Sequence, residues 1–174
     1  IYGSQLLLNE KKNLADSWIF DRLNHTVSEV TRLFDEYKFG EAGRELYNFI
    51  WNDFCDWYIE ISKVALNGDD EELKARKQEN LIWILDQILR LMHPIMPFVT
   101  EKLWLSMPHE GKSIMTAKYP ETHAEFENKQ ADSDMAFLIE VIKAVRNIRM
   151  EVNAPMSSQI DIMIQLDDEA NKHI

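Results

Sequence analysis

The last third of the sequence contains four polar residues whose types and spacing fit contacts with phosphate groups or nucleobases. Several of them are three or four positions apart, and at that spacing side chains on a helix are neighbours. Arginine supplies a planar group that forms paired hydrogen bonds with phosphates and bases. Glu140 and Glu151 flank the group, so a solvated charged helix face is the alternative interpretation. The four residues are Lys143, Arg146, Asn147 and Arg149.

No set of residues has the composition of an active site. Cys55 lies between Phe54 and Asp56 in an aromatic segment, where packing is the common role of a free cysteine. His93 precedes a proline at an expected helix end, where it can bond the last carbonyls as a structural residue. No Glu is followed three residues later by His, and one cysteine with scattered histidines has no zinc spacing. We therefore expect no catalytic residue, metal or other cofactor in this chain.

Composition restricts the partners. The chain has 174 residues, a net charge of −11 and a pI near 4.9, so contact with nucleic acid requires a local basic patch. A single cysteine suits a reducing compartment. The apolar run from Leu91 to Thr100 is too short to span a membrane, and the first residues lack a signal-peptide pattern. We expect a cytoplasmic fragment of a longer protein, because the chain begins with Ile1 rather than Met.

Hydrophobic periodicity predicts a mainly α fold, a bundle of about five helices. The expected helices run from residue 13 to an interruption at Gly40, then over 41–67, 71–92, 98–106 and 132–152. Asp70 should cap the third helix, and prolines 94 and 97 should end it. The residues expected to face the core include Leu14, Trp18, Tyr37, Phe54, Trp57, Tyr58, Val64, Leu85, Trp104, Met135, Leu138, Ile139 and Ile148.

The remaining segments are expected to be a tail, a connection and the start of a second unit. Residues 1–12 form the tail and 107–130 a long connection, briefly extended at 113–117. From Ile160 to Leu166 apolar and polar residues alternate, which predicts a strand with one buried face. One strand is not stable alone, so residues 154–174 are expected to begin a truncated α/β subdomain after a bundle over 13–153. At this level an RNA-binding bundle and a protein-interaction bundle fit equally well.

Six ordered strings resemble the anticodon-binding region of class I aminoacyl-tRNA synthetases, and the valyl branch most of all. The string Phe54-Cys55-Asp56-Trp57-Tyr58 favours that branch, because isoleucyl relatives usually lack it. The string from Leu91 to Trp104, with its His-Pro-Ile-Met-Pro-Phe core, is shared by valyl, isoleucyl and leucyl enzymes. The other strings are residues 14–19 with 22–24, 39–44 with 46–51, 107–111, and 144–149 with 151–153.

The resemblance implies a module that docks the anticodon stem-loop of a valine-accepting tRNA. Its parent enzyme would attach valine to tRNA with ATP and Mg²⁺ and edit errors elsewhere, and the parent's catalytic domain would be a partner. The family's nucleotide-binding strings are absent from this sequence. The expected tRNA-binding residues are Lys143, Arg146, Asn147 and Arg149, followed by Arg22 and Arg44. Arg44 follows Gly40-Glu41-Ala42-Gly43 at the start of an expected helix, where phosphate can bind. The alternatives are an isoleucyl or leucyl module and a protein-interaction bundle without an RNA role.

Overall fold

The computed structural model of the chain describes residues 13–155, 161 and 163, and these residues form helices in the order that the periodicity predicts. The segments α2, η1 and α3 follow one another without a break, so the predicted second helix is one helix with a π-helical middle. The mainly α fold is confirmed. The long elements are α1 (Leu14–Asp35), α2 (Phe39–Asn48), η1 (Phe49–Ile59), α3 (Glu60–Leu66), α4 (Glu71–Met92), α5 (Pro97–Trp104) and α6 (Lys129–Glu151).

Polar caps and a proline fix several helix ends. Asn13 precedes α1, and its side-chain oxygen accepts a hydrogen bond from the backbone N–H of Asp16 at 2.9 Å. Asp70 precedes α4 and accepts in the same way from Leu73 at 3.0 Å. Pro97 occupies the first turn of α5, where its missing N–H costs no helical hydrogen bond. No helix among the described residues is long and apolar enough to cross a membrane.

The break between α1 and α2 lies at Tyr37, not at Gly40. Tyr37 adopts the left-handed conformation, with φ of 59°, and its side chain is 81% exposed. The backbone N–H of Lys38 then donates to the carbonyl of Leu33 at 2.8 Å, which closes the end of α1. Gly40 lies inside the first turn of α2. Our predictions that Gly40 ends the first helix and that Tyr37 faces the core are therefore wrong.

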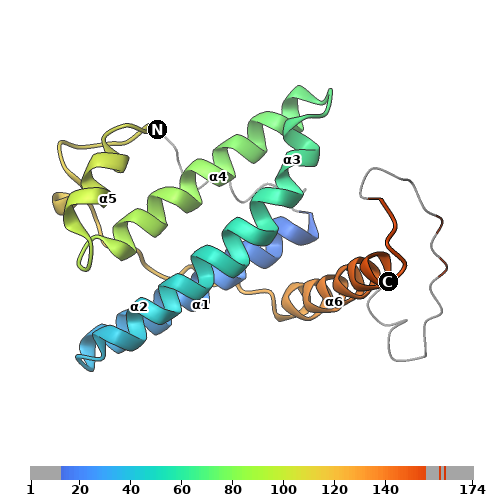
Figure 1. The fold of residues 1–174 in the computed structure, drawn as a ribbon. Coiled ribbons are helices and arrows are strands. Elements are labelled where there is room, and N and C mark those ends of the chain that lie inside the picture. The colour runs from blue at the N-terminus through green and yellow to red at the C-terminus, as the bar shows by residue number, and fades with distance from the viewer. Residues whose placement is uncertain (1–12, 156–160, 162, 164–174) are drawn as a thin grey trace.

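The bundle surrounds one main core, and α6 reaches out from it. Figure 1 shows α1 and α2 side by side, α4 continuing the bundle toward α5, and α6 extending away from the other helices. The first half of α6 packs on α1 and buries Ala131 and Met135. Its second half leaves Ile148 58% exposed, and Leu138 is 39% exposed, so both expected core positions are wrong. The second half of α6 therefore exposes apolar as well as polar side chains, among them Lys143, Arg146 and Asn147.

A buried ion pair joins three helices at one end of the core. The ammonium of Lys77 in α4 pairs with the carboxylate of Asp16 in α1, and both side chains are almost fully buried. The hydroxyl of Tyr58 in η1 donates to the same carboxylate at 2.7 Å. The Lys77 nitrogen also lies 5.0 Å from the centre of the Tyr58 ring. Burial, reinforced by the Asp16 charge, raises the pKa of Tyr58.

The π-helical segment changes which residues face the core after it. A π-helix bonds residue i to i+5, so each turn holds about one residue more than an α-turn. Beyond η1, Ser62 is fully buried and Val64 is 80% exposed, opposite to the prediction for Val64. Two residues in other helices, Leu14 of α1 and Leu85 of α4, were also expected to face the core, but each is 37% exposed.

The connection before α6 is helical where we expected an extended segment. Residues Ile114–Thr116 form the 3₁₀-helix η2, and Ala124–Phe126 form a second one, η3. The hydroxyl of Ser113 accepts from the backbone N–H of Met115, which starts η2. The predicted strand over 160–166 lies outside the described residues except for Asp161 and Met163, and the tail 1–12 lies outside them entirely.

Candidate nucleic-acid interface

An arginine of α6 lies on an aromatic ring of η1. The central guanidinium carbon of Arg146 is 5.4 Å from the centre of the Trp57 ring. Such a contact holds the planar group in place and stabilises it by about 0.5–1 kcal/mol at an exposed site. We assigned Trp57 to the core, but its ring is only partly buried and also supports this cation. No spacing rule links the two residues, because they lie in helices far apart in the sequence.

This pair belongs to an open groove of about 710 Å³ between η1 and α6. The η1 wall and the start of α3 supply carboxylates and the Trp57 ring, and the α6 wall supplies two cations. A groove with an aromatic floor and charged walls has the chemistry to hold one unstacked nucleobase and its phosphate. The lining residues are Asn52, Asp53, Asp56, Trp57, Glu60, Ile139, Lys143 and Arg146.

Two of the three carboxylates in the groove are already paired. Asp53 accepts from the Arg22 guanidinium at 2.9 Å, and Glu60 pairs with Lys63 at 2.6 Å. Burial raises the pKa of Asp53, and the Arg22 charge opposes that shift.

Asp56 is the third carboxylate, and it lines the groove with the two cations of the opposite wall. Within the described part of the chain, Asp56, Lys143 and Arg146 have no salt-bridge partner, and all three are exposed. Free charge in the groove thus consists of one carboxylate facing two cations.

The structure brings some of the predicted site residues together and separates others. Lys143 and Arg146 line the groove, and Arg22 reaches its edge through Asp53. A second hollow beside it is lined by all four predicted α6 residues and Met150. In that hollow the Arg149 guanidinium donates to the carbonyl of Pro155 at 2.6 Å. Arg44 is exposed on α2, which packs on α1, η1 and α4 rather than on α6.

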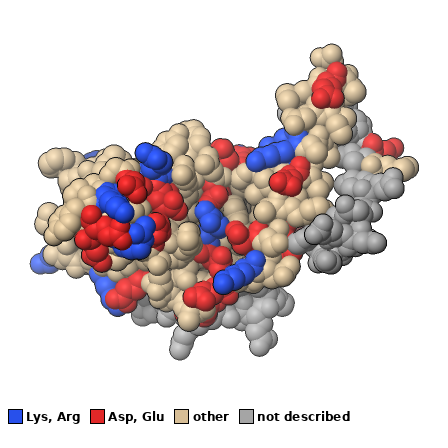
Figure 2. Space-filling view, turned by 90° about the horizontal axis from the view of Figure 1, so that it is seen from below, with Lys and Arg blue, Asp and Glu red and all other residues tan. Residues whose placement is uncertain are grey.

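Positive charge is local rather than spread over a face. Figure 2 shows Lys and Arg side chains interspersed with Asp and Glu side chains, without a separate basic field on that side of the molecule. A net charge of −11 therefore leaves short-range contacts, such as those of Lys143 and Arg146, as the means of holding phosphate.

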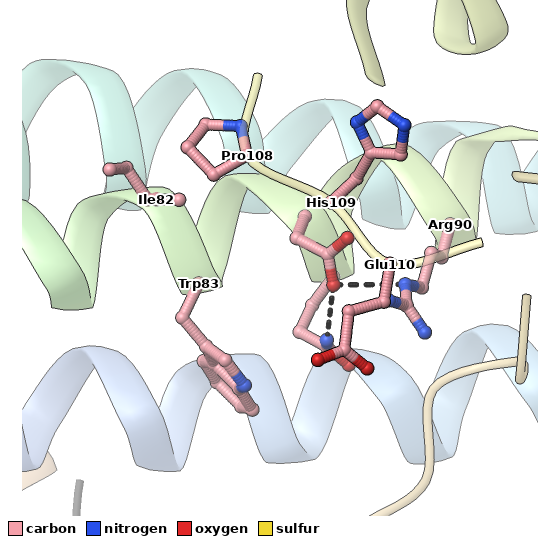
Figure 3. A pocket seen from close by; sticks show the side chains of 8 residues that line it. Ile82, Trp83, Arg90, Pro108, His109 and Glu110 are labelled. Carbon is pink, nitrogen blue, oxygen red and sulfur yellow. Dashed lines mark hydrogen bonds and ion pairs between the residues drawn. The ribbon is translucent and has the colours of Figure 1, made fainter. Parts of the chain in front are cut away.

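The string 107–111 covers a buried tryptophan. Figure 3 shows Pro108, His109 and Glu110 passing over α4 near Trp83 and Arg90, at a hollow of about 230 Å³. Below it the Trp104 ring is fully buried, and its N–H donates to Asp86 at 2.7 Å. The His109 ring packs on Trp104 with ring centres 4.3 Å apart. Trp104 is the predicted core residue, and this string is structural.

The Leu91–Trp104 string is structural too. A ring nitrogen of His93 is hydrogen-bonded to the Thr100 hydroxyl at 2.8 Å, so the histidine is structural as predicted but bonds a side chain instead of the last carbonyls. Glu101 accepts from the Ser113 hydroxyl at 3.0 Å and from the backbone N–H of Ile114 at 3.1 Å. These bonds tie α5 to η2 and account for the helix that replaces the expected extended segment.

Cys55 packs against the main core, as predicted, and is partly buried. Burial, together with the charge of Asp56, raises the pKa of the thiol and keeps it protonated at neutral pH. The described residues contain no group of three or more His, Cys, Asp or Glu side chains that could hold a metal ion.

A separate apolar surface lies where α2 and η1 meet the end of α4. The hollow there is about 260 Å³ and is lined by apolar side chains together with Gly43. Trp51 is 55% exposed, and its ring stacks in parallel with that of Tyr47. The hollow is also lined by Tyr47, Ile95 and Met96, which are 60%, 44% and 41% exposed. Exposed apolar side chains gathered around one hollow can mark an interface.

Comparison with known proteins identifies the family. Residues 16–164 match the family described as "Anticodon-binding domain of tRNA ligase". The chain is 90% identical to a valine–tRNA ligase of Lactobacillus johnsonii over 94% of its own length, and 64% identical to one of Lactiplantibacillus plantarum over 89%. It spans 19% and 17% of those proteins, about a fifth of their length. The predicted resemblance to the valyl branch is thus confirmed, and the chain belongs to the anticodon-binding domain family of tRNA ligases.

Proposed function

We propose that this chain is the anticodon-binding domain of a valine–tRNA ligase and that it binds the anticodon stem-loop of a valine-accepting tRNA. The observation that carries the proposal is the family match over residues 16–164, joined to 90% identity with a protein of that name. The two relatives reported above are valine–tRNA ligases, which favours this proposal over the isoleucyl and leucyl alternatives.

Within the domain, we place the RNA contact on the polar face of α6. Sequence-specific RNA recognition targets loop bases that leave the stack and lie on aromatic rings or guanidinium planes. Arg146 offers such a plane, and the Trp57 ring beneath it limits its motion. Lys143 and Asn147 are exposed beside it and reach the same side of the helix. Arg149, Arg22 and Arg44 remain candidates with weaker access, since the first two already bond protein groups.

A salt series of stem-loop binding tests this site. We expect the chain to bind an RNA stem-loop carrying a valine anticodon loop more tightly than one carrying an isoleucine loop. Replacing Lys143 and Arg146 together by alanine removes two cations that attract phosphate, so the steepness of log K against log salt should fall by roughly 1.4. Lys74→Ala is the control, because Lys74 pairs with Glu71 on α4. Equal affinity of the double variant and the unchanged chain would refute the α6 site.

The longer ligase supplies the rest of the function. We propose that valine activation with ATP and Mg²⁺ takes place in a catalytic domain outside this chain, in the cytoplasm, and that this catalytic part is the other partner. The relatives are about five times as long as the chain, which leaves ample sequence for such a domain. The apolar surface around Trp51 supports the proposal, since a contact with the remainder of the ligase would bury it.

A further inference from the structure

We propose that Asp56 is a specificity-determining residue that accepts a hydrogen bond from the exocyclic amino group of one unstacked loop base held in the groove between η1 and α6. The inference rests on the proposed function, because the base belongs to the same RNA loop. It goes further by naming the residue that reads the base and the chemical class of base that it selects. Asp56 is distinct from the six cationic and amide residues that sequence spacing and resemblance single out.

Asp56 is the carboxylate of the groove that is available to a ligand. Three acidic side chains line the groove, and Arg22 and Lys63 neutralise two of them at 2.9 Å and 2.6 Å. Asp56 is exposed and forms no ion pair with any described residue. A paired carboxylate has fewer free acceptor sites, whereas Asp56 keeps both oxygens for a ligand.

The charges of the two walls determine how a nucleotide would lie in the groove. Phosphate is repelled by Asp56 and attracted by Lys143 and Arg146, which face it from the α6 wall. The sugar–phosphate backbone therefore runs along α6, and the base points toward η1. In that orientation one base face lies against the Arg146 guanidinium, whose central carbon is 5.4 Å from the centre of the Trp57 ring that supports it from the other side, and the base edge meets Asp56.

The Asp56 carboxylate determines which bases fit the groove. An ionised carboxylate only accepts hydrogen bonds, so it favours the amino groups of adenine, cytosine and guanine. Uracil presents two carbonyl oxygens beside its single ring N–H, and these repel a carboxylate. The groove should therefore discriminate against uracil at one loop position. Discrimination by one well-placed base contact is worth about 1–3 kcal/mol, or roughly 5- to 150-fold in affinity.

The π-helical turn supplies the geometry. Asn52, Asp56 and Glu60 follow one another at steps of four, and Trp57 is next to Asp56. All four line the groove, with Asn52, Asp56 and Trp57 inside η1 and Glu60 directly after it. A wide π-turn brings residues four apart closer to one face than an α-turn does, and π-helical turns are frequent at functional sites. The same wide turn carries the acceptor and the stacking ring on one wall.

The test measures binding of this chain to the valine anticodon stem-loop while each amino-bearing loop base is replaced in turn by uracil. We expect one position at which uracil weakens binding about tenfold or more. In Asp56→Asn, which keeps the size of the side chain, the loss at that position should shrink to about threefold or less. Glu60→Gln is the matched control, because it removes the same charge from the same wall and should preserve the tenfold loss.

Each outcome separates the inference from the proposed function. If Asp56→Asn keeps the full discrimination while the Lys143 and Arg146 variants lose binding, the α6 site stands and the role of Asp56 is overturned. If Asp56→Asn and Glu60→Gln both tighten binding of every loop equally, Asp56 acts only through its charge and the inference also falls. If the unchanged chain does not bind the stem-loop at all, the proposed function and the inference are both overturned.

Discussion

At the scale of single residues, the buried charge of Lys77 is the most consequential feature of the core. Asp16, Tyr58 and Lys77 come from three helices and satisfy one another away from water. A buried charge that loses its partner carries a large desolvation penalty, whereas the intact pair contributes modest net stability. The network therefore matters mainly because breaking it is costly, and it makes the packing of α1, η1 and α4 mutually dependent.

We predict that Lys77→Met lowers the free energy of unfolding by about 3–5 kcal/mol, because it leaves the Asp16 carboxylate buried without a counter-charge. Urea denaturation followed by circular dichroism measures the change. Lys74→Met, three residues away on the surface, should change it by less than about 0.5 kcal/mol. The double variant Asp16→Leu with Lys77→Met should recover much of the loss. A single-variant effect below about 1 kcal/mol would contradict this account of the pair.

The buried phenols predict a loss of stability in alkali. Burial raises the pKa of Tyr119 to about 12 and that of Tyr58 further still, above the value of about 10 for an unfolded tyrosine. Above pH ~10 the unfolded chain loses these protons and the folded chain keeps them, so stability is complete below pH ~10 and falls as the pH rises toward 12.

Tyr119→Phe removes one of these groups and should flatten the decline. Ultraviolet absorbance at about 295 nm reports phenolate, and circular dichroism reports folding. Phenolate from the buried tyrosines should appear together with unfolding. Unaltered pH dependence in Tyr119→Phe would show that its phenol titrates normally in the folded chain.

At the scale of elements, apolar periodicity locates the helices well and their orientation less well. The bounds of α4 match the prediction because Asp70 and the prolines mark both ends. The face of α3 that packs on the core differs from the prediction, because the π-helical segment before it shifts the positions that face inward. No sequence rule predicts a π-helical segment. For α6, spacing finds the basic face, but Ile148 stays exposed because α1 covers only the first half of the helix. Asp56 and Trp57 join the site only through tertiary packing across the groove.

The α1–α2 junction gives a prediction at this scale. Tyr37 holds φ of 59°, a conformation that costs a residue with a Cβ about 1 kcal/mol or more and costs glycine little. Its ring is 81% exposed and contributes little packing. Tyr37→Gly should therefore raise the free energy of unfolding by about 1 kcal/mol, measured by thermal and urea denaturation. Tyr37→Ala keeps the Cβ and should bring no such gain; equal effects of the two changes would rule out strain at this position.

At the scale of the whole molecule, net charge and apolar surface have opposite effects on the association of chains. The net charge of −11 makes the chains repel one another in solution and confines RNA contacts to short range. The apolar surface between α2, η1 and the end of α4 instead favours association. In the proposed ligase these surfaces face different partners, since the RNA side lies between α6 and the part of η1 from Asn52 onward, and the apolar side lies where α2 and the start of η1 meet the end of α4.

The isolated chain should therefore self-associate through the apolar surface. Trp51 and Tyr47 are 55% and 60% exposed on this surface, and burying such rings against a second chain stabilises the pair by about 25 cal/mol per Å² of apolar area removed from water. Sedimentation velocity over a concentration series should show a mass that rises with concentration, more steeply at high salt, where repulsion between the acidic chains is screened. Trp51→Ser with Tyr47→Ser should keep the chain monomeric. Val64→Ser, which removes an apolar side chain that is 80% exposed on α3, should leave the association unchanged. If Val64→Ser abolished association as well, the chains would associate nonspecifically through any exposed apolar side chain. The result would then argue against the apolar surface as the docking face for the remainder of the ligase.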